Sequence, residues 1–279
     1  MHLDRYAVVG NPVAHSRSPF IHARFAEQTG QAIEYGRVLC PLDAFVDTVN
    51  AFRAAGGRGC NITVPFKLQA PGLAAHVTER AALAGAANVL RFDADGWSAD
   101  NTDGVGLIRD IQQGEGFDLA GQTVLLVGAG GAGAGVLGPL LQARPRRVVL
   151  ANRTRATADA LVQRHAALAH ACGCELAASG LDDAGTGFQV LINASASSLQ
   201  GAGSPVPARV LAPGALAVDL MYGPAAEAFL AWARQHGACT RDGLGMLVEQ
   251  AAEAFLLWRG VRPQTAPVLQ ALRDELTKG

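Results

Sequence analysis

The sequence predicts an α/β protein with two domains, an N-terminal α/β domain and a C-terminal domain built on a parallel sheet of the Rossmann type. A glycine-rich turn follows an aliphatic strand within residues 123–133, and beyond residue 121 short strands alternate with helical patterns. The chain has 279 residues, of which 49% are hydrophobic and 17% charged, so it is long enough to bury a core in each of two domains.

In the N-terminal half, apolar runs and turn residues indicate several strands and helices. Ser18 and Pro19 are typical of a helix start, with the Ser18 hydroxyl as N-cap and proline in the first turn, and Gly30 is a stop signal. The predicted strands are 6–9, 35–39, 60–64 and a hairpin of 87–92 with 97–98; the predicted helices are 18–29, 41 to about 56, a helical region up to 84, and one from 100–104 to about 114.

The C-terminal half begins after a predicted linker at 114–121. Its predicted strands are 123–127, 147–151, 175–178, 189–193, 215–220 and a short one near 238. Strands alternating with helices favour a parallel sheet covered on both faces. Two final helices, 246–259 and 267–277, follow this sheet and are expected to return to the first domain. The expected domains are therefore 1–104, completed by 245–279, and 118–243.

The glycines at 128, 130 and 133 have the spacing G-x-G-x-x-G in a strand–turn–helix context. The first glycine permits the tight turn, the second lets the backbone approach a pyrophosphate, and the third allows the helix to pack close to the strand. Amide groups at the helix N-terminus would face the phosphates. The alternative is a purely structural turn.

The second predicted strand of this domain ends in Asn152, Arg153, Thr154 and Arg155, where an NAD site would carry an acidic residue for the ribose hydroxyls. Arginine can pair with a 2′-phosphate through its planar fork. The sequence therefore predicts NADP rather than NAD; a solvated loop with incidental arginines is the alternative.

Composition limits the partners and the compartment. The net charge of −1 does not favour nucleic acid, no apolar run is long enough for a membrane span, and the first six residues show no signal-peptide core. The odd count of five cysteines indicates reduced thiols and a cytoplasmic protein. His165, His170, Cys172 and Cys174 do not have a standard zinc spacing, so no metal site is expected.

Several polar residues of the first half are ambiguous when each is taken alone. Lys67 follows a strand that places Asn61 and Thr63 on one face, and it can exchange a proton, but an ordinary surface lysine is the better interpretation. For Asp100 and Asp103 helix capping is the better interpretation. Ser16 and Ser18 can hold a carboxylate before a helix start, although capping already explains Ser18.

Several short segments along the chain form a recognisable set: 10–19 (Gly-Asn-Pro-Val-Ala-His-Ser-Arg-Ser-Pro), 61–67 (Asn-Ile-Thr-Val-Pro-Phe-Lys), 85–88 (Gly-Ala-Ala-Asn), 100–106 (Asp-Asn-Thr-Asp-Gly-Val-Gly), 128–132 (Gly-Ala-Gly-Gly-Ala), 152–154 (Asn-Arg-Thr), 193–195 (Asn-Ala-Ser) and 242–250 (Asp-Gly-Leu-Gly-Met-Leu-Val-Glu-Gln). Taken together, these segments resemble the shikimate dehydrogenase family. Segments 10–19, 61–67 and 100–106 are highly specific in combination.

The resemblance implies reversible NADPH-dependent reduction of 3-dehydroshikimate to shikimate, a step of chorismate and aromatic amino acid biosynthesis, with Lys67 and Asp103 as the catalytic pair. It implies roles for five further groups of residues. The substrate carboxylate would be bound by Ser16 and Ser18, helped by Tyr222, and the ring hydroxyls of the substrate by Asn61, Thr63, Asn88 and Gln250. The pyrophosphate of the cofactor would be held by Gly128, Ala129, Gly130, Gly131 and Ala132, and its 2′-phosphate side by Asn152, Arg153, Thr154 and Arg155. The nicotinamide side would be formed by Met221, Gly243 and Met246.

The chain departs from the family pattern at three positions. Ala134 replaces a usual arginine in the glycine-rich loop, so Arg153 and Arg155 are expected to carry more of the phosphate binding; Val89 and Ser195 replace usual threonines. None of these changes touches the catalytic pair.

Two other functions remain open: a quinate/shikimate or aminoshikimate-type dehydrogenase paralogue, and a non-catalytic NADP sensor that regulates a partner. An acidic residue near 152–155 would have supported the first, and a sensor would need neither Lys67 nor Asp103. The expected partner is a small-molecule substrate, with no nucleic acid or membrane, in a monomer or homodimer.

Overall fold

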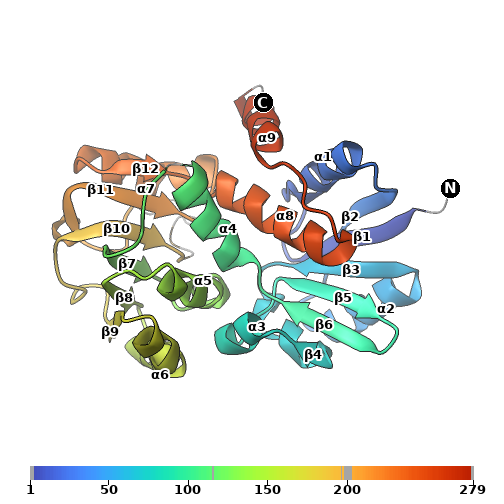
Figure 1. Cartoon of the computed structure of the whole chain (residues 1–279), viewed down its shortest axis with the longest axis horizontal. Coiled ribbons are helices and arrows are strands. Elements are labelled where there is room, and N and C mark those ends of the chain that lie inside the picture. Colours follow the sequence, from blue (N-terminus) through green and yellow to red (C-terminus); the bar gives the residue numbers. More distant parts are fainter. Residues whose placement is uncertain (1–2, 115, 196, 198–202, 278–279) are drawn as a thin grey trace. The chain divides into compact units, whose positions relative to one another are not determined.

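The computed structural model describes residues 3–114, 116–195, 197 and 203–277, and the described chain divides into two compact units (Figure 1). The first unit comprises 1–106 together with 248–279, and the second comprises 107–247. The chain passes between the units within helix α4 (Asp103–Arg109) and returns within α8 (Leu244–Arg259). The predicted linker 114–121 falls in the range of the second unit, and Glu115 in it lies outside the described residues, as do Met1 and His2 of the N-terminal segment.

The first unit contains a mixed six-stranded sheet of order β2-β1-β3-β5-β6-β4. Neighbours β2, β1 and β3 are parallel, whereas β5 pairs antiparallel with both β3 and β6. The predicted hairpin is confirmed, since Val89 pairs with Asp100 and Asp93 with Gly96. The strands are β1 (Asp4–Gly10), β2 (Ile33–Leu39), β3 (Gly57–Ile62), β4 (His76–Val77), β5 (Val89–Asp93) and β6 (Gly96–Asp100).

Alternation along β1 explains why this sheet is covered on both faces. Tyr6 points to one face, where its ring stacks on Trp258 of α8 at 4.7 Å between centroids. Val9 points to the other face, into a buried cluster with Phe45 and Val49 of α2 (Phe45–Ala54). Odd and even strand positions therefore face different helices.

Helix α1 (Ser18–Thr29) has the predicted bounds, and Gly30 ends it with φ of 64°, as predicted. The predicted capping role of Ser18 is wrong, because Arg17 occupies the N-cap position and the Ser18 amide donates to the Ser16 hydroxyl instead. Helix α2 begins at Phe45 rather than at Pro41.

The region before residue 84 is less helical than predicted. It consists of two short 3-10 turns, Phe66–Leu68 and Ala70–Leu73, then strand β4 and only then α3 (Glu79–Ala84). Pro71 and Gly72 interrupt the pattern because neither favours continued α-helix. The Thr78 hydroxyl caps α3 by accepting a hydrogen bond from the Ala81 amide.

The second unit contains a parallel six-stranded sheet of order β12-β11-β10-β7-β8-β9, as predicted for the C-terminal half. This is the strand order of a Rossmann fold, in which ligands bind where the order reverses, here between β7 and β10. The strands are β7 (Thr123–Val127), β8 (Arg147–Ala151), β9 (Glu175–Ser179), β10 (Phe188–Asn193), β11 (Leu211–Asp219) and β12 (Cys239–Arg241).

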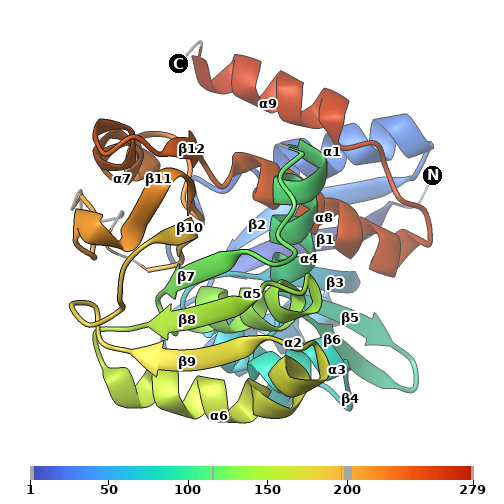
Figure 2. The ribbon, with the colours of Figure 1, turned by 60° about the vertical axis from the view of Figure 1, so that its left-hand side comes forward.

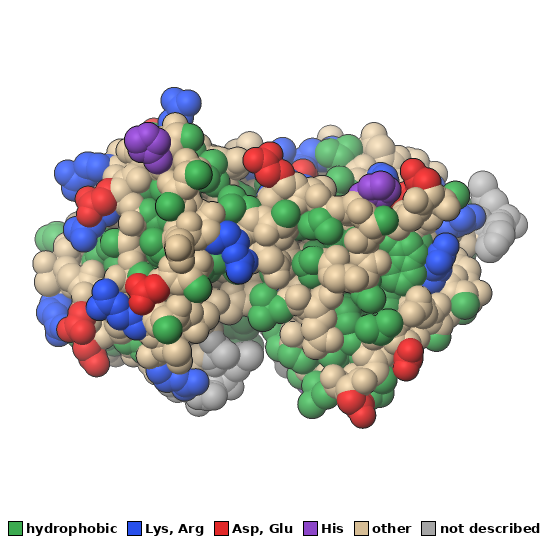
Figure 3. All heavy atoms as spheres, turned by 90° about the horizontal axis from the view of Figure 1, so that it is seen from below, with side chains coloured by type: hydrophobic (Ala, Val, Ile, Leu, Met, Phe, Trp, Pro, Cys, Tyr) green, Lys and Arg blue, Asp and Glu red, His purple; other side chains and the backbone are tan. Residues whose placement is uncertain are grey.

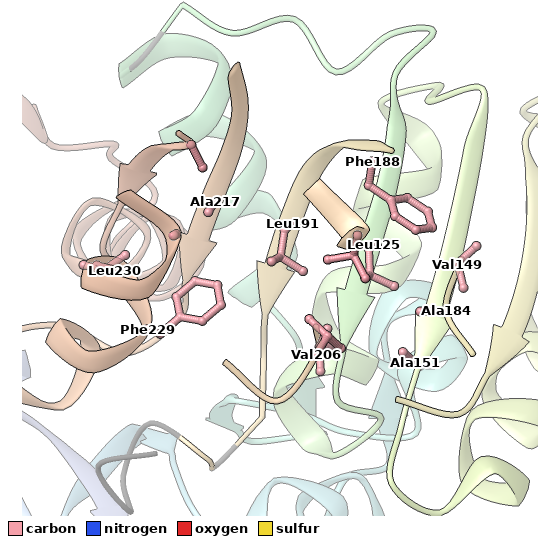
Figure 4. Close-up of a cluster of buried hydrophobic side chains, with 14 of the residues drawn as sticks. Leu125, Val149, Ala151, Ala184, Phe188, Leu191, Val206, Ala217, Phe229 and Leu230 are labelled. Atoms are coloured by element: carbon pink, nitrogen blue, oxygen red, sulfur yellow. The ribbon is translucent and has the colours of Figure 1, made fainter. Parts of the chain in front are cut away.

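A buried apolar cluster covers one face of this sheet (Figure 4). Leu125, Val149 and Leu191 meet Phe229 and Leu230 of α7 there. Figure 2 shows β7, β8 and β9 side by side, with α6 running along β9. The helices of the second unit besides the ends of α4 and α8 are α5 (Gly131–Gln142), α6 (Arg155–Ala171) and α7 (Pro224–Gln235).

Helix α4 continues as a turn of π-helix, Asp110–Gly114. Its Asp110 carboxylate forms a buried ion pair with Arg241 of β12, in which the side chains are only 2% and 9% exposed. The terminal helices α8 and α9 (Ala266–Thr277) agree with the two predicted at the C-terminus.

Lys and Arg side chains are interspersed with Asp and Glu over the face drawn in Figure 3. Among the described helices, none combines the length and the apolar character needed to cross a bilayer.

Candidate active site

Lys67 and Asp103 form a close ion pair in the first unit. Lys67 Nζ lies 2.6 Å from Asp103 Oδ2, and the two side chains are 16% and 5% exposed. The turn that carries Lys67 is anchored by Phe66, which is fully buried and stacks on Phe45 at 4.8 Å. The prediction that Lys67 is an ordinary surface lysine is therefore wrong, because its side chain is mostly covered and its ammonium pairs with a buried carboxylate.

Asn88 holds the other oxygen of this carboxylate. Its Nδ2 donates to Asp103 Oδ1 at 2.8 Å and lies 3.1 Å from Gln250 Oε1 of α8. The amide of Thr102 donates to Asn88 Oδ1 at 2.8 Å, which fixes the orientation of the carboxamide because a backbone amide can only donate. Segments distant in sequence thus meet around Asp103.

Asp103 is placed by the polar turn before α4. Asn101 accepts the Asp103 amide at its Oδ1 and donates from Nδ2 to the Ala86 carbonyl. Asp100 receives Arg80 Nε and Nη2 at 2.6 and 2.7 Å, with 7% of its side chain exposed. Helix α4 begins at Asp103 and is preceded by Thr102, so neither aspartate occupies the N-cap position and the capping interpretation is wrong for both.

Asn61 and Thr63 lie at the end of β3, near the pair. Asn61 Nδ2 donates to the Asn88 carbonyl at 3.2 Å, and Asn61 Oδ1 accepts from the Tyr35 hydroxyl at 2.6 Å. The strand ends at Ile62, one residue before half-buried Thr63. These contacts connect Tyr35 to Asp103 through Asn61 and Asn88.

Ser16 and Ser18 lie together in the turn before α1. Ser16 Oγ and Ser18 Oγ are 3.2 Å apart, and Ser16 Oγ also accepts the Ser18 amide. Arg37 of β2 donates to the Ser16 carbonyl from Nε and Nη2 at 3.1 and 2.7 Å. The two hydroxyls and this guanidinium form a polar, cationic corner of the first unit.

The glycine-rich loop of the second unit shows why glycine is needed at two of its positions. Gly128 has φ of 105°, a conformation that side chains disfavour. A Cβ atom on Gly133 would overlap the Gly128 carbonyl oxygen, whereas one on exposed Gly130 would meet nothing within 4 Å. The loop is therefore tightly packed at Gly133 and open to solvent at Gly130, and the open side leaves room for a pyrophosphate at the start of α5.

Asn152 joins this loop to the end of β8. Its Oδ1 accepts the Ala129 amide at 3.1 Å, and its Nδ2 donates to the Thr154 carbonyl at 2.9 Å. Arg153 is exposed, and Arg155 lies 3.8 Å from Asp159 with 63% of its side chain exposed. Two guanidinium groups next to the loop fit a cofactor with an additional phosphate.

The remaining predicted residues also belong to the second unit. The Gly243 amide donates to the Met221 carbonyl at 2.8 Å, so these two positions are adjacent. Tyr222 is half-buried between β11 and α7, and Met246 is 7% exposed in α8. His165 is buried with Nδ1 near the Leu161 carbonyl, and the described part of the chain contains no cluster of possible metal ligands.

Family models match most of the chain. The model of the shikimate dehydrogenase substrate binding domain matches residues 8–90, that of shikimate / quinate 5-dehydrogenase matches 110–199, and that of the shikimate 5′-dehydrogenase C-terminal domain matches 243–273. A shikimate dehydrogenase (NADP(+)) of Methylibium petroleiphilum is 64% identical over 276 residues, covering 97% of this chain and 94% of the relative. This chain belongs to the shikimate dehydrogenase family.

Solved structures have the same fold. An Ael1 enzyme from Pseudomonas putida has a TM-score of 0.86 at 48% identity, covering 96% of this chain and 98% of that one. The shikimate 5-dehydrogenase of Thermus thermophilus in complex with shikimate has a TM-score of 0.81 at 35% identity, covering 99% and 100%. The predicted fold class is thus confirmed.

In this shikimate dehydrogenase family member, the site includes residues that the sequence did not single out. Thr102 was part of a matching segment but was assigned no role, and Arg80 and Arg37 carried no signal because isolated arginines are common on surfaces. Tyr35 is one aromatic residue in an edge strand. Their contacts with Asn88, Asp100, Ser16 and Asn61 could be found only in three dimensions.

Proposed function

We propose that this chain is an NADP-dependent shikimate dehydrogenase that catalyses the reversible reduction of 3-dehydroshikimate to shikimate, a step toward chorismate and the aromatic amino acids. The observation that carries the proposal is the Lys67–Asp103 ion pair, in which Nζ and Oδ2 are 2.6 Å apart. The Asp103 carboxylate also accepts a hydrogen bond from Asn88, which in turn contacts Gln250. The membership of the family adds the substrate class and the cofactor.

The reaction requires a group that stabilises charge on a carbonyl oxygen. When bound, NADPH supplies the hydride. The Lys67 ammonium stabilises the negative charge that develops on the substrate C3 oxygen and donates the proton to it. Asp103 orients Lys67 through Oδ2 and keeps its ammonium directed at the site, while Asn88 fixes Oδ1.

The substrate carboxylate is assigned to the serine turn. Ser16 and Ser18 present two hydroxyls, and the Arg37 guanidinium on the Ser16 carbonyl adds positive charge. Tyr222 would also bind the carboxylate. Asn61, Thr63, Asn88 and Gln250 would bind the ring hydroxyls. Amide side chains suit hydroxyl groups because they offer both a donor and an acceptor.

The cofactor is assigned to the second unit. The open side of the loop from Gly128 to Ala132 would hold the pyrophosphate, and the turn from Asn152 to Arg155 the 2′-phosphate. Met221, Gly243 and Met246 would lie on the nicotinamide side. Ala134 is 3% exposed, so this helix position presents no surface to a phosphate, and the exposed arginines would supply the cationic contacts.

We also propose the roles of the two parts of the chain: residues 1–104 with 245–279 bind the substrate, and 118–243 bind NADP. The free thiols of all five cysteines support a cytoplasmic enzyme. Its partner is the small-molecule substrate, with neither nucleic acid nor membrane, and light scattering of the purified protein distinguishes a monomer from a homodimer.

The decisive measurement is the change in nicotinamide absorbance with shikimate and with quinate, each against NADP and NAD. We expect the largest kcat/KM for shikimate with NADP. A larger value for quinate would make this a quinate/shikimate paralogue. Binding of NADP without turnover of either substrate would instead indicate a sensor, and would overturn the proposal.

A further inference from the structure

Tyr35 occupies a fixed position next to Asn61, one of the proposed substrate-binding residues. It lies on edge strand β2, and its ring stacks on that of His22 from α1 at 4.2 Å with planes only 6° apart. Trp258 of α8 lies 6.3 Å away on a tilted plane. Helices from both ends of the chain thus hold this ring in one orientation.

The hydroxyl of Tyr35 completes the hydrogen bonds of Asn61. Asn61 is 5% exposed, so its amide groups need partners within the protein. Its Nδ2 must face the Asn88 carbonyl at 3.2 Å, because a carbonyl can only accept. This orientation turns Oδ1 toward the Tyr35 hydroxyl, which donates to it at 2.6 Å.

We propose that Tyr35 is a positioning residue for substrate recognition: it fixes the Asn61 carboxamide so that Asn61 presents an N–H donor to a ring hydroxyl of the substrate. The inference rests on the proposed function, in which Asn61 binds such a hydroxyl. Tyr35 is assigned no contact with the substrate and acts through Asn61; its hydroxyl also has a side-chain hydrogen bond with Ser18, so the test must separate these two routes.

The polarity of the site follows from this arrangement. With Oδ1 accepting from Tyr35 and one hydrogen of Nδ2 directed at Asn88, the other Nδ2 hydrogen is the one that Asn61 can offer to a ligand; the buried His22 ring is a further polar neighbour of Asn61. Asn61 is therefore preorganised as a donor, and the substrate oxygen that it meets must accept. If the hydroxyl of Tyr35 were removed, the carboxamide could rotate, and binding would then include the cost of orienting it.

The donor role of Tyr35 is maintained across the working pH range. Burial raises the pKa of the Tyr35 hydroxyl well above its ordinary value, so the group keeps its proton. The hydrogen bond to Asn61 therefore has one direction only.

The test is Tyr35→Phe, which keeps the stacked ring and removes only the hydroxyl. We expect KM for shikimate at saturating NADP to rise about five- to tenfold, the effect of one buried hydrogen bond, with kcat and KM for NADP nearly unchanged. The matched control is Tyr6→Phe, because Tyr6 stacks on Trp258 in the same unit and its hydroxyl lies near Arg259, away from Asn61. This control is expected to leave all three constants unchanged.

A double-mutant cycle separates positioning from general structural damage. In an Asn61→Ala background, Tyr35→Phe is expected to have no further effect on KM, because its target is gone. Additive effects, an unchanged KM in the single Tyr35→Phe variant, or a fall in kcat as large as the rise in KM would each overturn the inference. If Asn61→Ala alone leaves KM for shikimate unchanged, Asn61 does not bind the substrate and the inference about Tyr35 is wrong. NADP-dependent turnover of shikimate by the wild type would still support the proposed reaction.

Discussion

At the scale of single residues, the proposed chemistry depends on one nearly buried cation. Lys67 is 16% exposed, and its ammonium contacts Asp103 at 2.6 Å. An ion pair in such a position is costly to desolvate, and the hydrogen bond from Asn88 to the Asp103 carboxylate compensates for part of that cost. The arrangement keeps a proton donor at a defined point.

Lys67→Ala is expected to lower kcat by at least about a hundredfold, because charge on the substrate oxygen loses its stabilising group in the transition state. Binding of shikimate and NADP, measured by titration, is expected to be largely retained. Arg91→Ala, which removes an exposed cation paired with Asp93 in the same unit, is the control and is expected to keep wild-type turnover. Near-wild-type kcat in Lys67→Ala would remove Lys67 from the chemistry.

Arg153→Ala is expected to raise KM for NADP about 10- to 100-fold and KM for NAD much less, because only NADP offers a 2′-phosphate to a guanidinium. Arg146→Ala is a matched control, since Arg146 is also exposed but precedes the opposite end of β8. Steady-state kinetics with both cofactors measure the effect. Equal losses with NADP and NAD would exclude a 2′-phosphate contact.

His22 contributes to stability in a pH-dependent way. Burial lowers the pKa of His22 to about 3, whereas the unfolded chain titrates near the ordinary value of about 6.5. Below pH 6.5 the unfolded state therefore takes up a proton that the folded state does not, and stability decreases as the pH falls. From pH 7 to pH 5 this costs about 2 kcal/mol.

His22→Phe keeps a ring against Tyr35 and removes the titrating group. We expect the free energy of unfolding, measured with urea at pH 7 and pH 5, to fall about 2 kcal/mol less in this variant than in the wild type. Equal decreases in the two proteins would show that His22 does not resist protonation in the folded state.

At the scale of elements, the start of α5 illustrates how one loop serves packing and binding with different glycines. Gly133 faces the Gly128 carbonyl, and Gly130 faces open space. A methyl group is therefore expected to disturb packing at the first position and ligand approach at the second.

Gly133→Ala is expected to destabilise the protein by about 1–3 kcal/mol through overpacking against backbone, measured by urea unfolding. Gly130→Ala is the matched variant: its free energy of unfolding is expected to stay within about 0.5 kcal/mol of the wild type, while its KM for NADP increases. Reversed effects at the two positions would contradict the assignment of the cofactor loop.

The elements that the sequence predicted best are those with short, apolar, repeated patterns. Strands β7 and β8 have the predicted bounds, because buried parallel strands are continuous aliphatic runs. The start of α2 and the region before α3 were predicted less well, because their boundaries depend on tertiary contacts such as the Phe45–Phe66 stack.

At the scale of the whole molecule, the proposed binding groups are divided between two units. Ser16, Asn61 and Lys67 belong to the first, and the glycine loop with Arg153 belongs to the second. Substitutions at these residues are therefore each expected to change the affinity for one ligand.

Ser16→Ala is expected to weaken binding of shikimate about three- to tenfold, through the loss of one hydroxyl, and to leave binding of NADP unchanged. Ser98→Ala, which removes a hydroxyl that donates to Asp93 in the same unit, is the control. Calorimetric titration with each ligand measures both affinities. An unchanged affinity for shikimate would place the substrate carboxylate elsewhere.

The sequence by itself determined the two-part α/β organisation, the parallel sheet and the candidate residues, because the period of apolar positions and the glycine spacing are local properties of the chain. Only the tertiary structure decided which meaning of Lys67, Asp100, Asp103 and Ser18 holds. The same polar residue types form ion pairs and cap helices, so the sequence alone does not distinguish the two roles. The partners are also distant in sequence, since Lys67 and Asp103 are 36 positions apart. The role of Tyr35 emerged in the same way, since its partner is 26 positions away and only the sheet brings them together.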